Sequence, residues 1–570
     1  FAGTTYTIPS LILQAGIFNG GTATFTFSGA VTLTGGTFTA SSGTMTLQGN
    51  YINLGGTFTH NSGTVAFTGA AATVDVNVTE TFNNLTLNKT AGVGQTITAG
   101  DTLTVNGTLT LTEGSFFIGT INAKGAISVA ATYDGSTGTL LIDGTGDQSF
   151  QVPSGAILPN IILNSSLSTI SFAAGANNTI ASLTLLNGIF TASTGTLIVT
   201  GAWTHTTGGT FTHNSGTVAF TGAAATVDVN VTETFNNLTL NKNAGVAQTI
   251  TAGDTLTVNG TLILTEGSFA TGTINAKGAI SVAATYDGST GTLLIDGSTD
   301  QSFSVASGAV MPNIILNSSL STISFAGTTY TIPSLILQAG IFTAASTSTT
   351  FSGVVTILGG TFNNNSAGSI TISGAFSLYG GTFNASTGTT TFSAGYTHLG
   401  GTFTHNSGTV AFTGAAATVD VNVTETFNNL TLNKTAGVGQ TITAGDTLTV
   451  NGTLTLTEGS FFIGTINAKG AISVAATYDG STGTLLIDGT GDQSFQVPSG
   501  AILPNIILNS SLSTISFAAG ANNTIASLTL LNGIFTASTG TLIVTGAWTH
   551  TTGGTFTHNS GTVAFTGAAA

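Results

Sequence analysis

The sequence predicts an all-β fold: a single continuous right-handed parallel β-helix (β-solenoid) with coils of about 18–21 residues. Three observations predict it. Short runs alternate apolar and polar residues with period 2, apolar residues at helical spacing are missing, and the chain repeats itself in steps of about 20 residues.

The short runs have the length and pattern of strands. In TLTVNGTLTLT (Thr102 to Thr112), Thr alternates with Leu or Val over two runs joined by Asn-Gly. GTLLIDG (Gly138 to Gly144) is bounded by turn residues in the same way. Because side chains alternate across a strand, Leu, Val, Ile and Phe share one face, and Thr and Ser share the other.

The small repeat is clearest in a GGTF series. Phe38 and Phe58 are 20 residues apart, and Phe362, Phe383 and Phe403 follow each other at 21 and 20 residues. A sandwich domain would repeat at a scale of roughly 100 residues. One coil of a parallel β-helix fits the shorter step, right-handed as parallel crossovers usually are. The phenylalanines of the series are therefore expected to point inward and stack along the axis.

Longer repeats are built from these units. Residues 54–225 recur as 399–570 without a difference, at an offset of 345, and a third, slightly divergent copy covers 210–342. The opening segment returns from Phe325, and that later copy contains a 21-residue insertion, the size of one coil. We expect residues 1–570 to form one solenoid rod, an interior fragment of a longer chain, because both Phe1 and Ala570 lie inside coils.

Composition excludes several classes of protein. Charged residues are 5 % of the chain, Arg and Cys are absent, and 6 Lys face 21 acids for a net charge of −15. Nucleic-acid binding needs clustered cations, so no nucleic-acid partner is expected. No stretch of about 20 apolar residues occurs, so no membrane insertion is expected in this segment. All charges lie in three blocks, 75–147, 228–300 and 420–492.

The histidines are the first candidates for chemistry. Four of them lie in THNSG motifs, His60, His213, His405 and His558, and three further histidines lie nearby, His205, His398 and His550. A metal site using His205 and His213 is conceivable, but no Cys or acid lies close by in sequence to complete a ligand set. Sibling coils carry Ala or Asn at the THNSG position, which favours a plain corner residue.

The acids suggest a polysaccharide-cleaving carboxylate pair or calcium binding. Glu80, Asp101 and Glu113 are expected on successive coils, which leaves a carboxylate pair open. The set recurs three times, which suits a repeated surface better than a single cleft, and the Asp-Gly pairs are typical of turns. The sequence thus predicts no enzyme, no catalytic, cofactor-binding or metal-ligating residues, and no cofactor.

Two other residue types have structural explanations. Sequons are frequent, as at Asn77, Asn84 and Asn164, and stacked Asn side chains at coil corners are the favoured interpretation. Trp203 and Trp548 occupy one position in two copies, so a packed or half-buried aromatic is expected there and not a carbohydrate platform.

Two segments carry a resemblance. FNNLTLNKTAGVGQTITAGDTLTVNGTLTLTEGSF (Phe82 to Phe116) and GGTFTHNSGTVAFTG (Gly55 to Gly69) resemble the repeats of giant secreted bacterial surface proteins. Those are similar to the β-helical stalks of filamentous-haemagglutinin-like and autotransporter-like adhesins. The resemblance implies an extracellular, bacterial cell-surface location and a non-enzymatic role.

Three functions follow as expectations. The first is a structural stalk, fibre or filament whose rods associate head-to-tail or laterally. The second is an adhesin with a distributed face for surface glycans, which gains from multivalency. The third is ice binding by Thr rows, which the uneven coil lengths disfavour.

Overall fold

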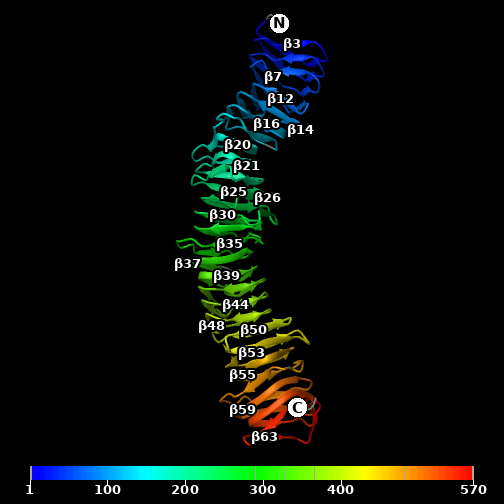
Figure 1. Ribbon diagram of the computed structural model, residues 1–570, viewed down its shortest axis with the longest axis vertical. Coiled ribbons are helices and arrows are strands. Elements are labelled where there is room, and N and C mark those ends of the chain that lie inside the picture. Colours follow the sequence, from blue (N-terminus) through cyan, green and yellow to red (C-terminus); the bar gives the residue numbers. More distant parts are fainter. Residues whose placement is uncertain are drawn as a thin grey trace. The chain divides into compact units, whose positions relative to one another are not determined.

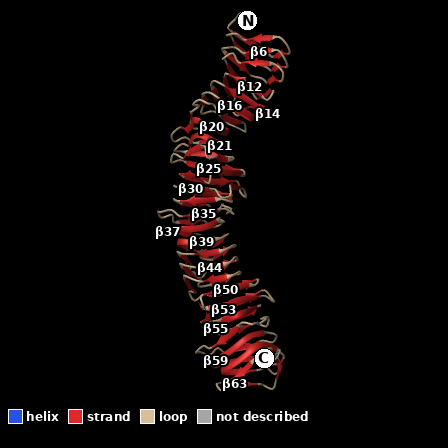
Figure 2. Cartoon of the chain, viewed as in Figure 1, coloured by secondary structure: helices blue, strands red, loops and turns tan. Residues whose placement is uncertain are grey.

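The computed structural model describes residues 3–135, 137–288, 290–325, 328–364, 366–480 and 482–567. The chain divides into two compact units, Phe1–Gly291 and Thr292–Ala570, each a stack of parallel strands (Figure 1). Among the described residues every regular element is a strand and none is a helix (Figure 2). The strands amount to about 28 solenoid turns, so the predicted all-β parallel solenoid is confirmed. Phe1 and Ala570, on which the expected interior position rests, lie outside the described residues.

In the first unit, one ladder of seven strands begins the stack. It runs in the order β1 (Thr5–Ile8), β4 (Thr24–Phe27), β7 (Thr44–Leu47), β10 (Thr64–Gly69), β13 (Asn84–Lys89), β15 (Leu109–Glu113) and β17 (Ile127–Val129). Each strand pairs in parallel with the strand of the next coil, as Val65 pairs with Leu85. A strand therefore contacts residues roughly one coil away and not its neighbours in sequence.

Two further ladders complete these coils. One contains β5 (Val31–Leu33), β8 (Tyr51–Asn53), β11 (Ala72–Val76), β12 (Thr79–Phe82), β14 (Gly94–Val105) and β16 (Ser115–Ala123). The other contains β3 (Ile17–Asn19), β6 (Thr37–Thr39) and β9 (Thr57–Thr59).

The same arrangement recurs later in the first unit. Its strands include β21 (Asn178–Thr191), β23 (Trp203–His205), β24 (Gly209–Thr212), β26 (Ala225–Val229), β27 (Thr232–Phe235) and β30 (Thr255–Val258). Leu185 on β21 pairs with His205 on β23, and Trp203 pairs with Val227 on β26.

In the second unit, an eight-stranded ladder plays the part of the first. Its order is β38 (Thr329–Ile332), β40 (Ser348–Phe351), β43 (Ser369–Ile372), β46 (Thr389–Phe392), β49 (Thr409–Gly414), β52 (Asn429–Lys434), β54 (Leu454–Glu458) and β56 (Ile472–Val474). Alongside it lie β42 (Thr361–Asn363), β45 (Thr382–Asn384), β47 (Tyr396–His398), β48 (Thr402–Thr404), β50 (Ala417–Val421), β51 (Thr424–Phe427) and β53 (Gly439–Val450).

The core is an axial column of apolar side chains. On β4 the alternate residues Phe25 and Phe27 are fully buried, while Thr24 and Thr26, which alternate with them, are part-exposed. The GGTF rings stack as expected: centroids of Phe362 and Phe383 lie 4.7 Å apart, and those of Phe383 and Phe403 lie 5.8 Å apart. Phe362 and Phe383 are fully buried, whereas Phe403 is half-buried. The inward stack is confirmed.

Some coils are longer than the expected 18–21 residues. Leu85 pairs with Leu109 and Trp203 with Val227, each 24 residues further along the chain. The extra residues lie in corner turns, such as the one that Val93 N–H closes onto the Thr90 carbonyl. Corners tolerate insertions because the stacked strands supply the packing.

Candidate functional site

The THNSG histidines are corner residues, as the sequence predicts. In all four copies the ring Nδ1 accepts a hydrogen bond from the backbone N–H of the Ser two residues on, at 3.0 Å for His60 and 3.1 Å for His213. In the first copy Asn61 and Ser62 both have positive φ, 47° and 58°, so the imidazole stabilises a tight left-handed turn.

A different set of side chains forms the candidate site. Each charged block contains one glutamate that the fold buries: Glu80 is 8 % exposed, Glu233 5 % and Glu425 6 %. In the sequence Thr79-Glu80-Thr81-Phe82 the glutamate shares strand parity with Phe82, which is fully buried. We name three clusters after these residues: the Glu80 cluster (Tyr51, Asn53, Glu80), the Glu233 cluster (Trp203, His205, Glu233) and the Glu425 cluster (Tyr396, His398, Glu425).

In the Glu80 cluster all donors are neutral. Tyr51 Oη donates to Glu80 Oε2 at 2.9 Å and Asn53 Nδ2 donates to the same oxygen at 2.6 Å. Oε1 accepts the Thr81 backbone N–H at 3.2 Å. Asn53 Oδ1 in turn accepts the Gly56 N–H at 3.0 Å, so the amide also holds the following turn.

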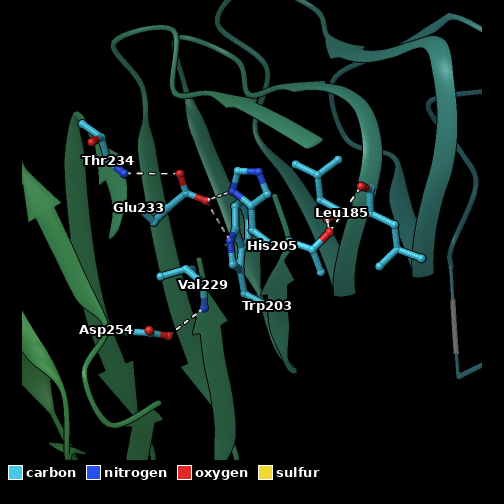
Figure 3. Close-up of polar contacts among 9 residues, drawn as sticks. Leu185, Trp203, His205, Val229, Glu233, Thr234 and Asp254 are labelled. Atoms are coloured by element: carbon cyan, nitrogen blue, oxygen red, sulfur yellow. Dashed lines mark hydrogen bonds and ion pairs between the residues drawn. The ribbon is translucent and has the colours of Figure 1, made fainter. Parts of the chain in front are cut away.

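In the Glu233 cluster a histidine replaces the amide. His205 Nδ1 lies 2.6 Å from Glu233 Oε2, and Trp203 Nε1 donates to that oxygen at 3.4 Å. Figure 3 shows both rings, from β23, directed at the carboxylate of β27. The backbone of Gly209 also acts on this ring and raises the pKa of His205.

The Glu425 cluster combines features of the other two. Tyr396 Oη donates to Glu425 Oε2 at 2.7 Å, as in the first cluster. His398 Nδ1 lies 2.5 Å from the same oxygen, as in the second, and the backbone of Gly401 also engages the ring.

Each buried glutamate follows a strained turn. Val78, Val231 and Val423 all have φ of 70° and are about two-thirds exposed, at 67 %, 65 % and 66 %. A β-branched residue in the left-handed region costs about 1–3 kcal/mol, which surrounding contacts must offset. The strand before the turn is held by a buried aspartate: Asp254 Oδ2 accepts the Val229 N–H at 2.8 Å (Figure 3). Asp101 and Asp446 do the same for Val76 and Val421.

The electrostatics of the clusters differ. Burial raises the pKa of Glu80 above its ordinary value of 4.5, although the hydrogen bonds from Asn53, Tyr51 and Thr81 oppose that rise. The hydrogen bond to Glu233 raises the pKa of His205 above 6.5, against burial, which lowers it. Glu425 raises the pKa of His398 in the same way. Burial raises the pKa of Tyr51 and Tyr396 well above 10.0, so both phenols stay protonated donors.

A cavity of about 230 Å³ lies beside each histidine cluster. In the first unit it is lined by His205, by the loop Thr206–Thr207 and by Asp228, Val229 and Asn230. In the second unit it is lined by His398, by Gly400 and Gly401, and by Asn422 and Thr424. The same corner is therefore hollowed at equivalent positions of two repeats.

The hydrogen bonding limits the chemistry of these histidines. A general base or a metal ligand needs a ring nitrogen with a free lone pair. In both clusters Nδ1 is occupied by a carboxylate, and the backbone of a following glycine also raises the pKa of the ring, as a second hydrogen-bond acceptor does. Among the described residues no group of three or more His, Cys, Asp or Glu is placed to hold a metal ion. What the clusters do is hold the corners together through buried hydrogen bonds.

Two sequence-based interpretations need correction. The sequence places no acid near His205, but the fold brings Glu233 to it from 28 residues away. The repetition of the acids suggests a repeated surface, yet Glu80 and Asp101 are buried hydrogen-bond acceptors on neighbouring coils. Strand parity is the signal that reveals this burial, because Asp101 alternates in step with the buried Leu103 and Val105. Glu113 lies apart, on β15, opposite Asn88.

The remaining predictions have mixed outcomes. Trp203 is fully buried and Trp548 half-buried, so the packed aromatic is confirmed. Asn side chains stack in single steps, as where Asn187 Nδ2 donates to Asn164 Oδ1 at 2.7 Å. Asn84 instead accepts the Thr108 N–H at 2.8 Å.

A buried lysine adds a charged group that the sequence patterns did not single out. Lys89 is 2 % exposed and its Nζ donates to the Thr68 carbonyl at 2.7 Å. Burial lowers its pKa to about 8. It shares parity with Leu85 and Leu87, the same signal that marks Glu80.

No family model, no curated protein and no solved structure matches the chain. In the described part of the chain, no helix has the length and apolar character needed to cross a membrane.

Proposed function

We propose that the chain is a non-enzymatic structural protein, part of an extracellular stalk, fibre or filament on a bacterial cell surface. The observation that carries the proposal is the regular coil-to-coil register of each unit. Parallel strands pair with the next coil, and aromatic rings follow one another at 4.7 to 5.8 Å. Such a stack resists local opening because each coil is held by both neighbours.

The surface and the repeats support a structural role that depends on the length of the solenoid. Outward strand positions are mostly Thr and Ser, with few charges, and residues 54–225 and 399–570 are identical. Duplicating whole coils lengthens a solenoid without creating a new fold. Association of chains head-to-tail or laterally would extend it further, and this too is part of the proposal.

Electron microscopy of native material tests this function. Thin filaments or surface stalks that bind an antibody raised against the chain are the expected result. Discrete globular particles, or labelling confined to the cell interior, would contradict it.

A second candidate is an adhesin with a distributed binding face for surface glycans. The specific observation in its favour is the pair of cavities of about 230 Å³ beside His205 and His398. Weak identical sites gain strength through multivalency. A glycan array separates the two functions: an adhesin retains specific sugars, and retention falls when one cavity is filled by Asn422→Trp at an exposed lining residue, whereas a stalk retains none.

A further inference from the structure

The Glu233 and Glu425 clusters share a hydrogen-bonding pattern that requires a proton. His205 donates from Nδ1 to Glu233 Oε2 at 2.6 Å, and its other nitrogen faces the backbone of Gly209. The corresponding contact at His550 is from Nε2 to the Gly554 carbonyl, at 3.0 Å. A ring that donates at both nitrogens is an imidazolium.

The two contacts tie together two corners that are far apart in sequence. One is the loop Thr206–Gly209, which follows His205 directly. The other is the strained turn Asn230–Val231, which precedes Glu233. The half-buried His205 ring lines the cavity between the corners, and the Glu233 side chain that it contacts is 7 % exposed.

Few other charged groups face this ring. Asp228 lines the cavity from β26, and Asp254 lies beyond it, bound to the Val229 N–H. On the preceding coil the paired residue is Leu185, and the neighbouring ring on β23 is the uncharged Trp203. At His398 the facing groups are Glu425 and Tyr396, with Asp420 one strand position away and Asp446 bound to the Val421 N–H.

We propose that the corner turns before Glu233 and Glu425 are proton-operated latches, closed while His205 and His398 are protonated and opened when they lose that proton. The carboxylate keeps one proton on Nδ1, so the proton lost is the one facing the glycine backbone. The loop after the histidine then loses its anchor, and the buried glutamate loses its counter-charge. The strained valine turn, which lies two residues before that glutamate in the chain, is then released.

The direction of the effect follows from linkage. A histidine whose pKa is raised by folding stabilises the fold below its ordinary pKa of 6.5, and that stability is lost as pH rises through the raised value. The latches are therefore closed in mild acid and open toward alkaline pH.

The chain contains a natural control for the two latches. The Glu80 cluster has the same turn, with Val78 at φ 70°, and the same buried glutamate, but Asn53 replaces the histidine. An amide donates to the carboxylate at 2.6 Å at any pH in this range, so this corner is no latch. Gly56 lies three residues after Asn53, as Gly401 lies three residues after His398, so Asn53→His recreates the residues of the Glu425 cluster beside Glu80.

Hydrogen–deuterium exchange on the full chain tests the latches between pH 6 and 9. Two peptides report on single copies despite the repeats: 226–243, which alone ends in Asn243, and 393–404, which alone contains Tyr396-Thr-His398. After correction for the intrinsic exchange rate, protection in both should fall by up to about tenfold per pH unit above the ordinary histidine pKa. In His205→Asn, protection of 226–243 should become independent of pH while 393–404 still responds.

The reciprocal variant Asn53→His tests the proposal by gain of pH dependence, so it remains informative if His205→Asn fails to fold. Asn53→His should give peptide 48–59, which is flat in the wild type, the pH dependence of 393–404. The proposal would be overturned if peptide 226–243 showed the same pH dependence of protection in the wild type and in His205→Asn. It would also be overturned if peptide 48–59 of Asn53→His stayed independent of pH.

Discussion

The Glu80 and Glu233 clusters solve the same problem with different chemistry. Both bury a glutamate behind a strained valine turn, yet Glu80 is held by Tyr51 and Asn53, and Glu233 by Trp203 and His205. The neutral donors leave the buried charge uncompensated, and burial raises the pKa of Glu80. The histidine supplies a counter-charge, and its own pKa rises. A shared backbone corner can thus be either indifferent or sensitive to pH near neutrality, depending on one side chain.

The largest expected effect comes from removing the aromatic donor. Trp203→Ala and Tyr51→Ala each delete a fully buried ring, and each should lower local stability by about 3–5 kcal/mol. Trp203 packs edge-on against Phe211 at 4.9 Å, so its loss should also loosen the ring stack. Exchange of peptides from the affected coils measures the loss. Because contacts are between neighbouring coils, peptides several coils away should not change, and uniform loosening would contradict the one-dimensional coupling.

Neutralising the glutamates should destabilise the Glu233 cluster more than the Glu80 cluster. Glu233→Gln removes an ion pair and should destabilise its coil by about 2 kcal/mol. In Glu80→Gln the amide oxygen can still accept from both Tyr51 and Asn53, so the cost should stay below about 1 kcal/mol. Local exchange at pH 6.5 compares them. Equal losses in the two variants would show that His205 carries no charge.

The pH windows of the two repeats should differ. A raised glutamate pKa means that stability present below pH 4.5 is lost as pH rises through the raised value. The corner at Glu80 should therefore weaken as pH rises from 4.5 through the raised pKa of Glu80, because its buried carboxyl group then ionises without a counter-charge. The corner at Glu233 should weaken only above 6.5. Chemical denaturation followed by pulsed exchange at pH 4, 6 and 8 measures the stability of each corner as a function of pH. If both corners lost stability at the same pH, the prediction would be contradicted.

The smallest effect should be the same in both repeats. Val78→Gly and Val231→Gly place a residue suited to φ of 70° in the turn, and each should stabilise its coil by about 0.5 kcal/mol. The gain is small because glycine also loses more chain entropy on folding. Matched Val→Ala variants, which keep the strain, serve as controls. If only one of the two variants were stabilised, the clusters would differ in the strain of the turn and not only in the side chain that contacts the glutamate.

Local patterns in the sequence determined the architecture. Period-2 alternation sets which side chains face inward, and repetition in steps of about 20 residues determines that strands pair with the next coil. The stack of Phe362, Phe383 and Phe403 follows from those two facts alone. Even the burial of Glu80 and Lys89 is predictable from the sequence, since both share strand parity with buried apolar neighbours.

The tertiary structure alone decided which polar side chains meet. Tyr51 reaches Glu80 across 29 residues, and His205 reaches Glu233 across 28. Those separations exceed the 24-residue coil step from Trp203 to Val227, because the glutamate lies a further six residues along the chain, on the strand after the corner turn. Corner length does not follow from alternation, since turns have no side-chain period. The pairing of a buried acid with a histidine, an amide or a phenol is therefore invisible along the chain and appears only when the coils are stacked.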